Sequence, residues 1–290
     1  MRLLLTGATG FLGESLVRRF LADGHQIVIL KRRTSVLPSL IASNAAIVCH
    51  DVEDGLAAAF VVTKPDAVIH LATCYGRSGE DMMTVFETNT AFSLHLLQAA
   101  RAAEVALFIN TDTALEKLTN AYSLSKRQFA EWGQWLAQRN EFTFINVRLE
   151  HMFGPGDAAS KFTAHVIGTL LENRLEINLT KGEQLRDFIY IDDVLSGYQT
   201  LLAHYAHNTV NGYIECDLGS GEAITIKDFV ELVHTLTKSR TKLNFGALPY
   251  RPGEVMRTQA DTSYLKKLGW RVQTSLADGI QKIIASEKIL

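Results

Sequence analysis

The residues best suited to chemistry are a tyrosine and a lysine, Tyr122 and Lys126, which stand four positions apart. In a helix this spacing places both side chains on one face. An ammonium group beside a phenol favours the phenolate and lowers the phenol pKa, so Tyr122 could donate or accept a proton near neutral pH. Because many helices carry such a pair by chance as an exposed contact, the motif indicates catalysis only together with a partner.

A threonine at the end of a predicted strand supplies that partner. The chain reads Asn110-Thr-Asp-Thr113 directly after the apolar run Val105–Asn110. Ligands of parallel α/β sheets bind at the carboxyl ends of the strands, where Thr113 could donate a hydrogen bond to the oxygen atom that Tyr122 protonates. A capping role is the alternative for either threonine. The position at a strand end favours Thr113, Tyr122 and Lys126 as catalytic residues.

Three glycines near the N-terminus indicate a dinucleotide site. The buried run Leu3–Leu5 leads into Gly7-x-x-Gly10-x-x-Gly13, after which apolar residues recur at helical spacing. Gly7 would permit a sharp turn, Gly10 the approach of a pyrophosphate to the backbone, and Gly13 close packing of helix on strand. Phosphates would then bind at the helix N-terminus. The spacing differs from the commoner Gly-x-Gly-x-x-Gly, so a plain tight turn is the alternative.

The end of the second strand bears on the choice of cofactor. NAD-binding units usually place a carboxylate there for the ribose 2′-hydroxyl, whereas this chain has Lys31, Arg32 and Arg33. Cations suit a 2′-phosphate, which arginine can bind through two hydrogen bonds. Three consecutive cations favour a binding site for NADP(H). A solvated basic loop without a binding role is the alternative. Asp51 and Val52 follow the third strand, where an adenine edge would lie, and Asp51 could equally be a helix cap.

Strands and helices alternate through the first half of the chain, which predicts a doubly wound parallel α/β sheet of order 3-2-1-4-5-6. After Leu3–Leu5, we expect strands at Gln26–Leu30, Ala46–Cys49, Ala67–Leu71, Val105–Asn110 and Phe142–Arg148. After a helix around Leu12–Leu21, we expect helices at Ser35–Ala42, Leu56–Val61, Asp81–Ala103 and Asn120–Arg139.

The regular alternation of strands and helices ends after Arg148, where Gly154-Pro-Gly156 interrupts it. Helices are predicted there at Lys161–Glu172, Asp192–His204 and Ile226–Lys238, mixed with short strands. The expected domains are a Rossmann-like domain at 1–149, with a return segment near 187–211, and a smaller substrate-binding lobe at 150–290.

Composition excludes several classes of protein. A net charge of −2 gives no sign of a surface for nucleic acid or anionic membranes. No apolar run is long enough to span a membrane, and no signal-peptide pattern precedes the first strand. The cysteines, Cys49, Cys74 and Cys216, lack metal-ligand spacing and are expected to pack as small hydrophobes in a cytoplasmic protein. His70 is expected to satisfy its ring against backbone groups, and no metal site is predicted.

Taken together, these motifs resemble the extended short-chain dehydrogenase/reductase family of nucleotide-sugar epimerases, dehydratases and reductases. The matching stretches are Thr6–Gly13, His70–Ala72, Asn89, Tyr122–Lys126, Arg148–Gly156, Arg186–Asp193 and Arg251–Glu254. Within that family the chain is most similar to the CDP-abequose and CDP-paratose synthases, NADPH-dependent reductases of C4 ketones of CDP-4-keto-3,6-dideoxyhexoses. The closer likeness lies in Cys74–Arg77, Asn110–Thr113, Arg148–His151 and Thr180–Phe188.

The resemblance implies a set of site residues. Thr113, Tyr122 and Lys126 are the implied catalytic residues. The implied substrate ligands are Arg77, His151, Lys161, Arg186 and Arg251, of which the last two would bind the sugar-nucleotide diphosphate. A structural ion pair is the alternative for either of those arginines. The implied cofactor contacts are Gly7, Thr9, Gly10, Phe11, Leu12, Gly13, Lys31, Arg32, Arg33, Asp51, Val52, Leu71, Ala72 and Lys126.

Departures from the family pattern narrow the activity. His151 stands where the family usually has asparagine, and Ala114-Leu115 replaces the Asp-Glu pair of the dehydratases. No cysteine lies near that position, as the 3,5-epimerising reductases require. The resemblance therefore implies NADPH-dependent reduction of a nucleoside-diphosphate 4-keto-6-deoxyhexose in deoxysugar and O-antigen biosynthesis. A C4 epimerase that retains its cofactor, or a non-catalytic NADP(H) sensor, is the alternative.

The resemblance also implies a homodimer. In similar proteins the helices corresponding to Asp81–Ala103 and Asn120–Arg139 pair across a two-fold axis. The apolar surface expected for this contact comes from Phe92, Leu96, Phe129, Trp132 and Trp135.

Overall fold

The computed structural model describes residues 1–139, 142–207 and 211–287, which form two compact units. The first unit comprises Met1–Arg148 and Tyr198–Cys216. The second comprises Leu149–Gly197 and Asp217–Leu290.

The division after Arg148 lies beside the expected boundary at residue 149, but the return segment begins later than expected. Residues 187–197 stay with the second unit, because strand β9 (Leu185–Tyr190) pairs with β7 (His151–Phe153). Residues 208–210 of the expected segment lie outside the described residues.

A mostly parallel sheet organises the first unit. Among the described residues seven strands form it, in the order β10-β6-β5-β4-β1-β2-β3. Their bounds are Arg2–Thr6 (β1), Gln26–Lys31 (β2), Ile47–Asp51 (β3), Ala67–His70 (β4), Leu107–Thr113 (β5), Thr143–Leu149 (β6) and Gly212–Leu218 (β10). The predicted order 3-2-1-4-5-6 is confirmed, with β10 added beside β6. Leu3, Leu4 and Leu5 are fully buried, as a strand covered on both faces requires.

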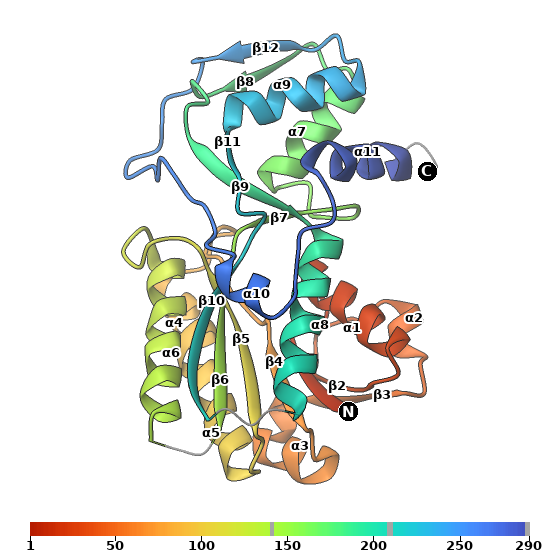
Figure 1. The fold of residues 1–290 in the computed structure, drawn as a ribbon, viewed down its shortest axis with the longest axis vertical. Helices are drawn as coiled ribbons and strands as arrows, with labels where there is room; N and C mark the ends of the chain where they lie inside the picture. The colour runs from red at the N-terminus through yellow and green to blue at the C-terminus, as the bar shows by residue number, and fades with distance from the viewer. Residues whose placement is uncertain (140–141, 208–210, 288–290) are drawn as a thin grey trace. The chain divides into compact units, whose positions relative to one another are not determined.

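Helices cover both faces of this sheet (Figure 1). Their bounds are Phe11–Ala22 (α1), Ser39–Ala42 (α2), Leu56–Thr63 (α3), Met82–Phe86 (α4), Phe92–Ala102 (α5) and Ala121–Ala137 (α6). Buried aromatic and aliphatic side chains of α3, α5 and α6, among them Phe60, Leu97 and Phe129, pack against one face, and α1 lies on the other. The predicted helix Ser35–Ala42 is too long, because Pro38 disfavours helical backbone in the residue before it.

The predicted helix Asp81–Ala103 contains a local change of winding. A π-helical segment, η2 (Glu87–Ala91), lies between α4 and α5. Such segments insert an extra residue into an α-helix and are frequent at functional sites. The buried Asn89 lies within it.

The apolar surface expected for a dimer differs from the observed one. Leu96 and Phe129 are completely buried in the core, so the prediction that they face a partner is wrong. Phe92 also packs against this core. Trp132 and Trp135 are 45% and 47% exposed on α6. The neighbouring helix α4 adds the exposed side chains of Met82, Met83 and Phe86.

The second unit combines small sheets with helices. β7, β9 and β11 (Ala223–Thr225) form one sheet, and β8 (Glu176–Leu179) pairs with β12 (Lys242–Phe245) in another. The helices are α7 (Phe162–Leu171), the first part of α8 (Ile191–His207), α9 (Ile226–Thr237), α10 (Ser263–Lys267) and α11 (Leu276–Glu287). Phe188 and Phe229 stack in this core with ring centroids 4.4 Å apart. The last helix, α11, packs against α7 and α9 and was not predicted.

Candidate active site

The glycine turn between β1 and α1 has the steric requirements that its sequence predicts. Gly7 has φ of +69°, and a Cβ atom there would lie 2.7 Å from the Ala72 backbone nitrogen. A Cβ atom on Gly13 would lie 2.1 Å from the carbonyl oxygen of Gly7. Gly10 donates its N–H to the same oxygen and is the N-cap of α1. Helix and strand therefore approach more closely than any side chain at Gly7 or Gly13 would permit.

The side chain of Thr6 connects the end of β4 to this turn through hydrogen bonds. Its hydroxyl accepts the backbone N–H groups of Leu71 and Ala72, each over 3.1 Å, and bonds His70 Nδ1 over 2.7 Å. His70 Nε2 bonds the hydroxyl of Ser93. The expectation that His70 satisfies itself against backbone is therefore wrong. Burial and the charge of Lys126 lower the pKa of His70 well below its ordinary value, so the ring is neutral.

The basic cluster after β2 is partly neutralised. Lys31 and Arg33 both pair with Asp51, and Arg33 also pairs with Asp54. Arg32 is exposed and has no ion pair among the residues the structure describes. Asp51 precedes η1 (Val52–Asp54) without capping it, so the capping interpretation is wrong. Hydrogen bonding to Lys31 is the main reason that the pKa of Asp51 lies below its ordinary value.

A capping box positions the tyrosine on α6. The side chain of Asn120 accepts the N–H of Ser123 over 2.8 Å, and the Ser123 hydroxyl accepts the N–H of Asn120 over 3.2 Å. This arrangement satisfies two free N–H groups at once. The helix therefore begins at Ala121, which puts Tyr122 in the first turn and Lys126 one turn later.

The strand β5 extends three residues beyond its predicted end and brings Thr113 to the tyrosine. The side chain of Thr113 acts on the Tyr122 phenol and lowers its pKa. Thr111, two residues earlier, instead bonds the hydroxyl of Tyr198 over 2.5 Å. The structure thus assigns the two threonines different partners, and Thr113 is the one that can act with Tyr122.

The pKa of Tyr122 differs from the one that the spacing of Tyr122 and Lys126 predicts. Burial raises the pKa of Tyr122 above its ordinary value, and Tyr75 and Asp112 act in the same direction. The expectation of a lowered phenol pKa is therefore wrong, because desolvation outweighs the opposing effects of the Thr113 side chain and the Arg77 charge. Lys126 is 1% exposed, and burial lowers its pKa to about 8, while Asp112 opposes this change. Its Nζ atom has no hydrogen-bond partner among the described residues.

A loop after β4 contributes residues that the sequence did not single out as catalytic. The ring of Tyr75 lies 5.0 Å from that of Tyr122, and the guanidinium of Arg77 lies 5.5 Å from the Tyr75 ring centroid. Asn89 holds the loop in place, since its side chain accepts the N–H of Cys74 and donates to the Cys74 carbonyl. The same amide donates to the Ser125 hydroxyl on α6. Arg77, a predicted substrate ligand, is exposed on this loop and is close enough to Tyr122 to lower its pKa.

The other predicted substrate ligands belong to the second unit. Arg186 is buried and pairs with Glu254 over 2.7 Å, while burial lowers its pKa. His151 bonds the carboxylate of Glu150 through Nδ1 over 3.3 Å. Glu150 also acts electrostatically on Arg186. This buried carboxylate was missed, because only its position beside both residues reveals its role.

Lys161 and Arg251 have contrasting surroundings in the same unit. Lys161 is the N-cap of α7 and pairs over 2.9 Å with Asp157, whose side chain is almost fully buried. Arg251 is exposed and has no ion pair in the described part of the chain. Of these cations, Arg251 is the one most available to a ligand.

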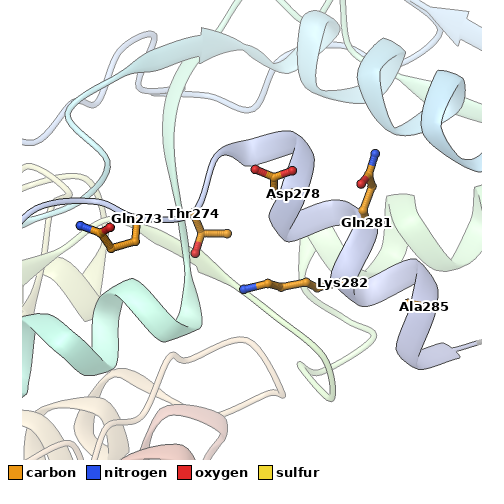
Figure 2. A pocket seen from close by; sticks show the side chains of 6 residues that line it. All are labelled: Gln273, Thr274, Asp278, Gln281, Lys282 and Ala285. Atoms are coloured by element: carbon orange, nitrogen blue, oxygen red, sulfur yellow. The ribbon is translucent and has the colours of Figure 1, made fainter.

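A separate surface hollow in the second unit contains none of the predicted residues. It is lined from α11 and the segment before it by Gln273, Thr274, Asp278, Gln281, Lys282 and Ala285 (Figure 2). The ammonium of Lys282 lies 4.7 Å from the Tyr190 ring and 3.5 Å from Asp192. These contacts compensate the charge of Lys282 within the protein.

Two further properties of the described residues concern metal binding and membrane spans. No group of histidine, cysteine and carboxylate side chains among them could hold a metal ion. None of the helices described combines the length and apolarity needed to cross a membrane. Cys216 is buried as expected, whereas Cys49 is exposed, so packing as a small hydrophobe does not describe it.

Comparison with known proteins agrees with this geometry. Residues 3–215 match the NAD dependent epimerase/dehydratase family. The chain is 32% identical to the CDP-abequose synthase of Salmonella muenchen, over 99% of this chain and 98% of the relative. It is 25% identical to the UDP-glucose 4-epimerase of Mycolicibacterium smegmatis, over 98% and 97%.

Solved structures show the same fold. A UDP-glucose 4-epimerase from Thermotoga maritima superposes with a TM-score of 0.86 at 20% identity, covering 100% of this chain and 99% of that one. MoeE5, solved with UDP-glucuronic acid and NAD, gives 0.85 at 24% identity over the full length of both chains. The chain therefore belongs to the NAD dependent epimerase/dehydratase family, within the extended short-chain dehydrogenases/reductases.

Proposed function

We propose that this protein is an NADPH-dependent reductase of the C4 ketone of a nucleoside-diphosphate 4-keto-6-deoxyhexose, or of its 3,6-dideoxy form, in deoxysugar and O-antigen biosynthesis. The observation that carries the proposal is the arrangement of Thr113, Tyr122 and Lys126. The side chain of Thr113 lowers the pKa of the half-buried phenol, and the buried ammonium of Lys126 has no hydrogen-bond partner among the described residues. The 32% identity to a CDP-abequose synthase supports the substrate class.

The first unit fits a dinucleotide cofactor. The turn at Gly7, Gly10 and Gly13 would hold the pyrophosphate at the N-terminus of α1, with contacts from Thr9, Phe11 and Leu12. Leu71 and Ala72 at the end of β4 are proposed to line the same site, with Asp51 and Val52 near the adenine. The buried Nζ atom of Lys126 is a donor suited to the hydroxyls of the nicotinamide ribose.

Arg32 is the proposed ligand of the 2′-phosphate. Both of its neighbours, Lys31 and Arg33, are already paired with carboxylates. Arginine binds phosphate through two parallel hydrogen bonds, which gives geometric selectivity as well as charge. This supports NADP(H) as the cofactor.

The proposed chemistry is transfer of a hydride to C4 and of a proton to O4. NADPH, when bound, supplies the hydride. Negative charge then develops on O4, and Tyr122 neutralises it by transferring its hydroxyl proton. Its raised pKa keeps this proton in place before the reaction, which suits an acid in the direction of reduction. Thr113 donates a hydrogen bond to O4, and the charge of Lys126 favours the phenolate that remains.

The cations of the second unit are proposed substrate ligands. Arg251 and Arg186 would bind the diphosphate, with Lys161 as a further contact. Because Glu254 already pairs with Arg186, the substrate would have to share or displace this carboxylate. His151, held through Nδ1 by Glu150, leaves Nε2 for a sugar hydroxyl. Arg77 of the first unit would contact the sugar beside Tyr122.

A C4 epimerase with a retained cofactor is the second candidate, because UDP-glucose 4-epimerases share this fold and family. Net reduction is favoured by Lys31-Arg32-Arg33, since an exchangeable NADPH needs a 2′-phosphate site. A non-catalytic sensor is less well supported, because the chain retains all three proposed catalytic residues, Thr113, Tyr122 and Lys126.

The test is NADPH oxidation with a panel of CDP-, dTDP-, GDP- and UDP-linked 4-keto-6-deoxyhexoses, with product stereochemistry determined by NMR. Stoichiometric oxidation with one of these ketones is expected. Interconversion of 4-hydroxy sugars without net oxidation of NADPH would instead establish the epimerase. Tight NADPH binding with neither reaction would support the sensor.

A further inference from the structure

Asp112 is a buried carboxylate next to the proposed catalytic residues. It lies on β5 directly before Thr113 and is 2% exposed. Its Oδ1 atom accepts the backbone N–H of Thr113 over 2.8 Å. Its Oδ2 atom accepts a hydrogen bond from Asn146 Nδ2 over 3.0 Å and lies 3.8 Å from Arg127 Nε. With both oxygens engaged, the carboxylate has one orientation available.

The partners of Asp112 are themselves held in a network. Arg127 donates to Glu215 over 2.6 Å, and Asn146 donates to the same carboxylate over 3.0 Å. Although burial opposes it, Asp112 and Glu215 raise the pKa of Arg127, so this side chain stays charged. Strands β5, β6 and β10 and helix α6 are thus connected through polar side chains directly behind Thr113.

Asp112 also acts on the two titrating residues of α6. Its charge opposes the lowering of the Lys126 pKa by burial and contributes to the raised pKa of Tyr122. Lys126 interacts electrostatically with Asp112 from β5 and with His70 from β4. Burial leaves both His70 and Tyr122 uncharged near neutral pH. Asp112 is therefore the carboxylate whose charge favours the ammonium form of Lys126.

We propose that Asp112 is a positioning residue of this site: it fixes the backbone that presents Thr113 to Tyr122 and supplies the negative charge opposite Lys126. The kinetic part of this inference rests on the proposed reductase function. The two roles are separable. An asparagine at this position can still accept the Thr113 N–H but carries no charge, whereas alanine loses both properties.

The charge is tested by the pH dependence of NADPH binding, measured by fluorescence titration of the wild type and Asp112→Asn. In this variant, the pH at which NADPH affinity falls is expected to be lower than in the wild type by about one unit or more. The reason is that an opposite charge favours the ammonium form of Lys126. Asp112→Glu restores the charge and is expected to restore the profile. Glu215→Gln, which removes a carboxylate from the same network without touching Thr113, serves as the matched control.

The positioning role is tested by turnover. Asp112→Ala is expected to lower kcat more than Asp112→Asn at a pH where Lys126 is charged in both. A binding profile of Asp112→Asn that coincides with the wild type, or that moves equally in Glu215→Gln, would overturn the charge role. If Asp112→Asn does not fold, Asp112→Ser is measured and judged by the same criterion. Should the wild type reduce no 4-keto sugar, the proposed function fails, while the binding profile still decides this inference.

Discussion

Lys31 at the end of β2 donates a hydrogen bond from Nζ to Oδ1 of Asp51 at the end of β3, over 2.7 Å. The parallel register places the two residues opposite each other. Arg33 is similarly engaged by Asp51 and Asp54. Two of the three consecutive cations are therefore compensated within the protein. The specificity for NADP(H) that we propose then depends mainly on Arg32.

Replacing Arg32 with alanine should weaken NADPH binding and leave NADH binding nearly unchanged. Loss of a charge-assisted hydrogen bond costs roughly 1.5–3 kcal/mol, or about tenfold or more in affinity. Titration of both cofactors into the wild type and the variant measures this. Arg33→Ala is the matched control and should have a smaller effect, because its guanidinium is already paired. Equal affinity of the wild type for NADH and NADPH would refute the proposal.

Tyr122→Phe should lower kcat by about 10²–10⁴-fold, the usual contribution of a positioned proton donor. NADPH affinity should hardly change, because the proposed role of the phenol hydroxyl is to transfer a proton to the substrate and not to bind the cofactor. Thr113→Val should cost less, since this residue donates a hydrogen bond without transferring a proton. Steady-state kinetics and fluorescence titration separate the two effects. Near wild-type turnover in Tyr122→Phe would remove the tyrosine from the mechanism and direct attention to His151.

Lys126→Ala should lower both kcat and NADPH affinity, because this residue serves the cofactor and the phenol together. The pKa of about 8 means that the ammonium is present below pH 8 and is lost above it. NADPH affinity should therefore fall as the pH rises through this range. Lys126→Arg provides the control, since a guanidinium remains charged at all these pH values. An affinity that falls equally in Lys126→Arg would assign the titration to another group.

The two arginines of the second unit should respond differently to substitution. Arg186→Ala leaves Glu254 without its buried partner, and breaking a buried ion pair costs about 3–5 kcal/mol. It should lower the melting temperature as well as raise the KM for the sugar nucleotide. Arg251→Ala should raise KM alone, because this side chain is exposed. Thermal unfolding and initial-rate measurements test both. A stable Arg186→Ala protein would show that the ion pair contributes little to the fold.

The exposed side chains of α4 and α6 support a homodimer. Trp132, Trp135 and the methionines of α4 form an apolar surface that a symmetric contact would bury. Light scattering at micromolar concentration should give twice the mass of one chain. Trp132→Glu together with Trp135→Glu should yield the monomer, while Val62→Glu, at an exposed position of α3, should not. A wild-type protein that is monomeric at this concentration would contradict the proposal.

The order of the central sheet was predictable because each buried strand is a short apolar run that ends in a turn or a polar segment. The expectation that Thr113 acts together with Tyr122 had a similar basis, since both positions follow from strand and helix boundaries. The short helix α2 shows the limit of periodicity, because a single proline moved its start to Ser39. The last helix, α11, was missed although Leu276, Ile280, Ile283 and Ile284 have helical spacing.

The pKa of Tyr122 was predicted with the wrong sign for a physical reason. The sequence shows that a lysine lies one helical turn away, but it does not show how much water is lost around the phenol. From the sequence, Asp112 was likewise identified only as part of the segment Asn110–Thr113. Its importance depends on contacts with Asn146 on β6 and with Arg127 on α6. Such contacts between distant segments have no signal in local spacing.

The π-helical segment at Glu87–Ala91 fixes the rotational phase of the helix on either side of it. One residue of an α-helix corresponds to a rotation of about 100°. Deleting Thr88 would favour an unbroken α-helix, and would turn α4 by that angle relative to α5. The exposed methionines of α4 would then change their position relative to the exposed tryptophans of α6, and Asn89 would lose its alignment with Cys74 and Ser125. A change of one residue in chain length here would therefore disturb both the exposed apolar surface of α4 and α6 and the loop that carries Arg77.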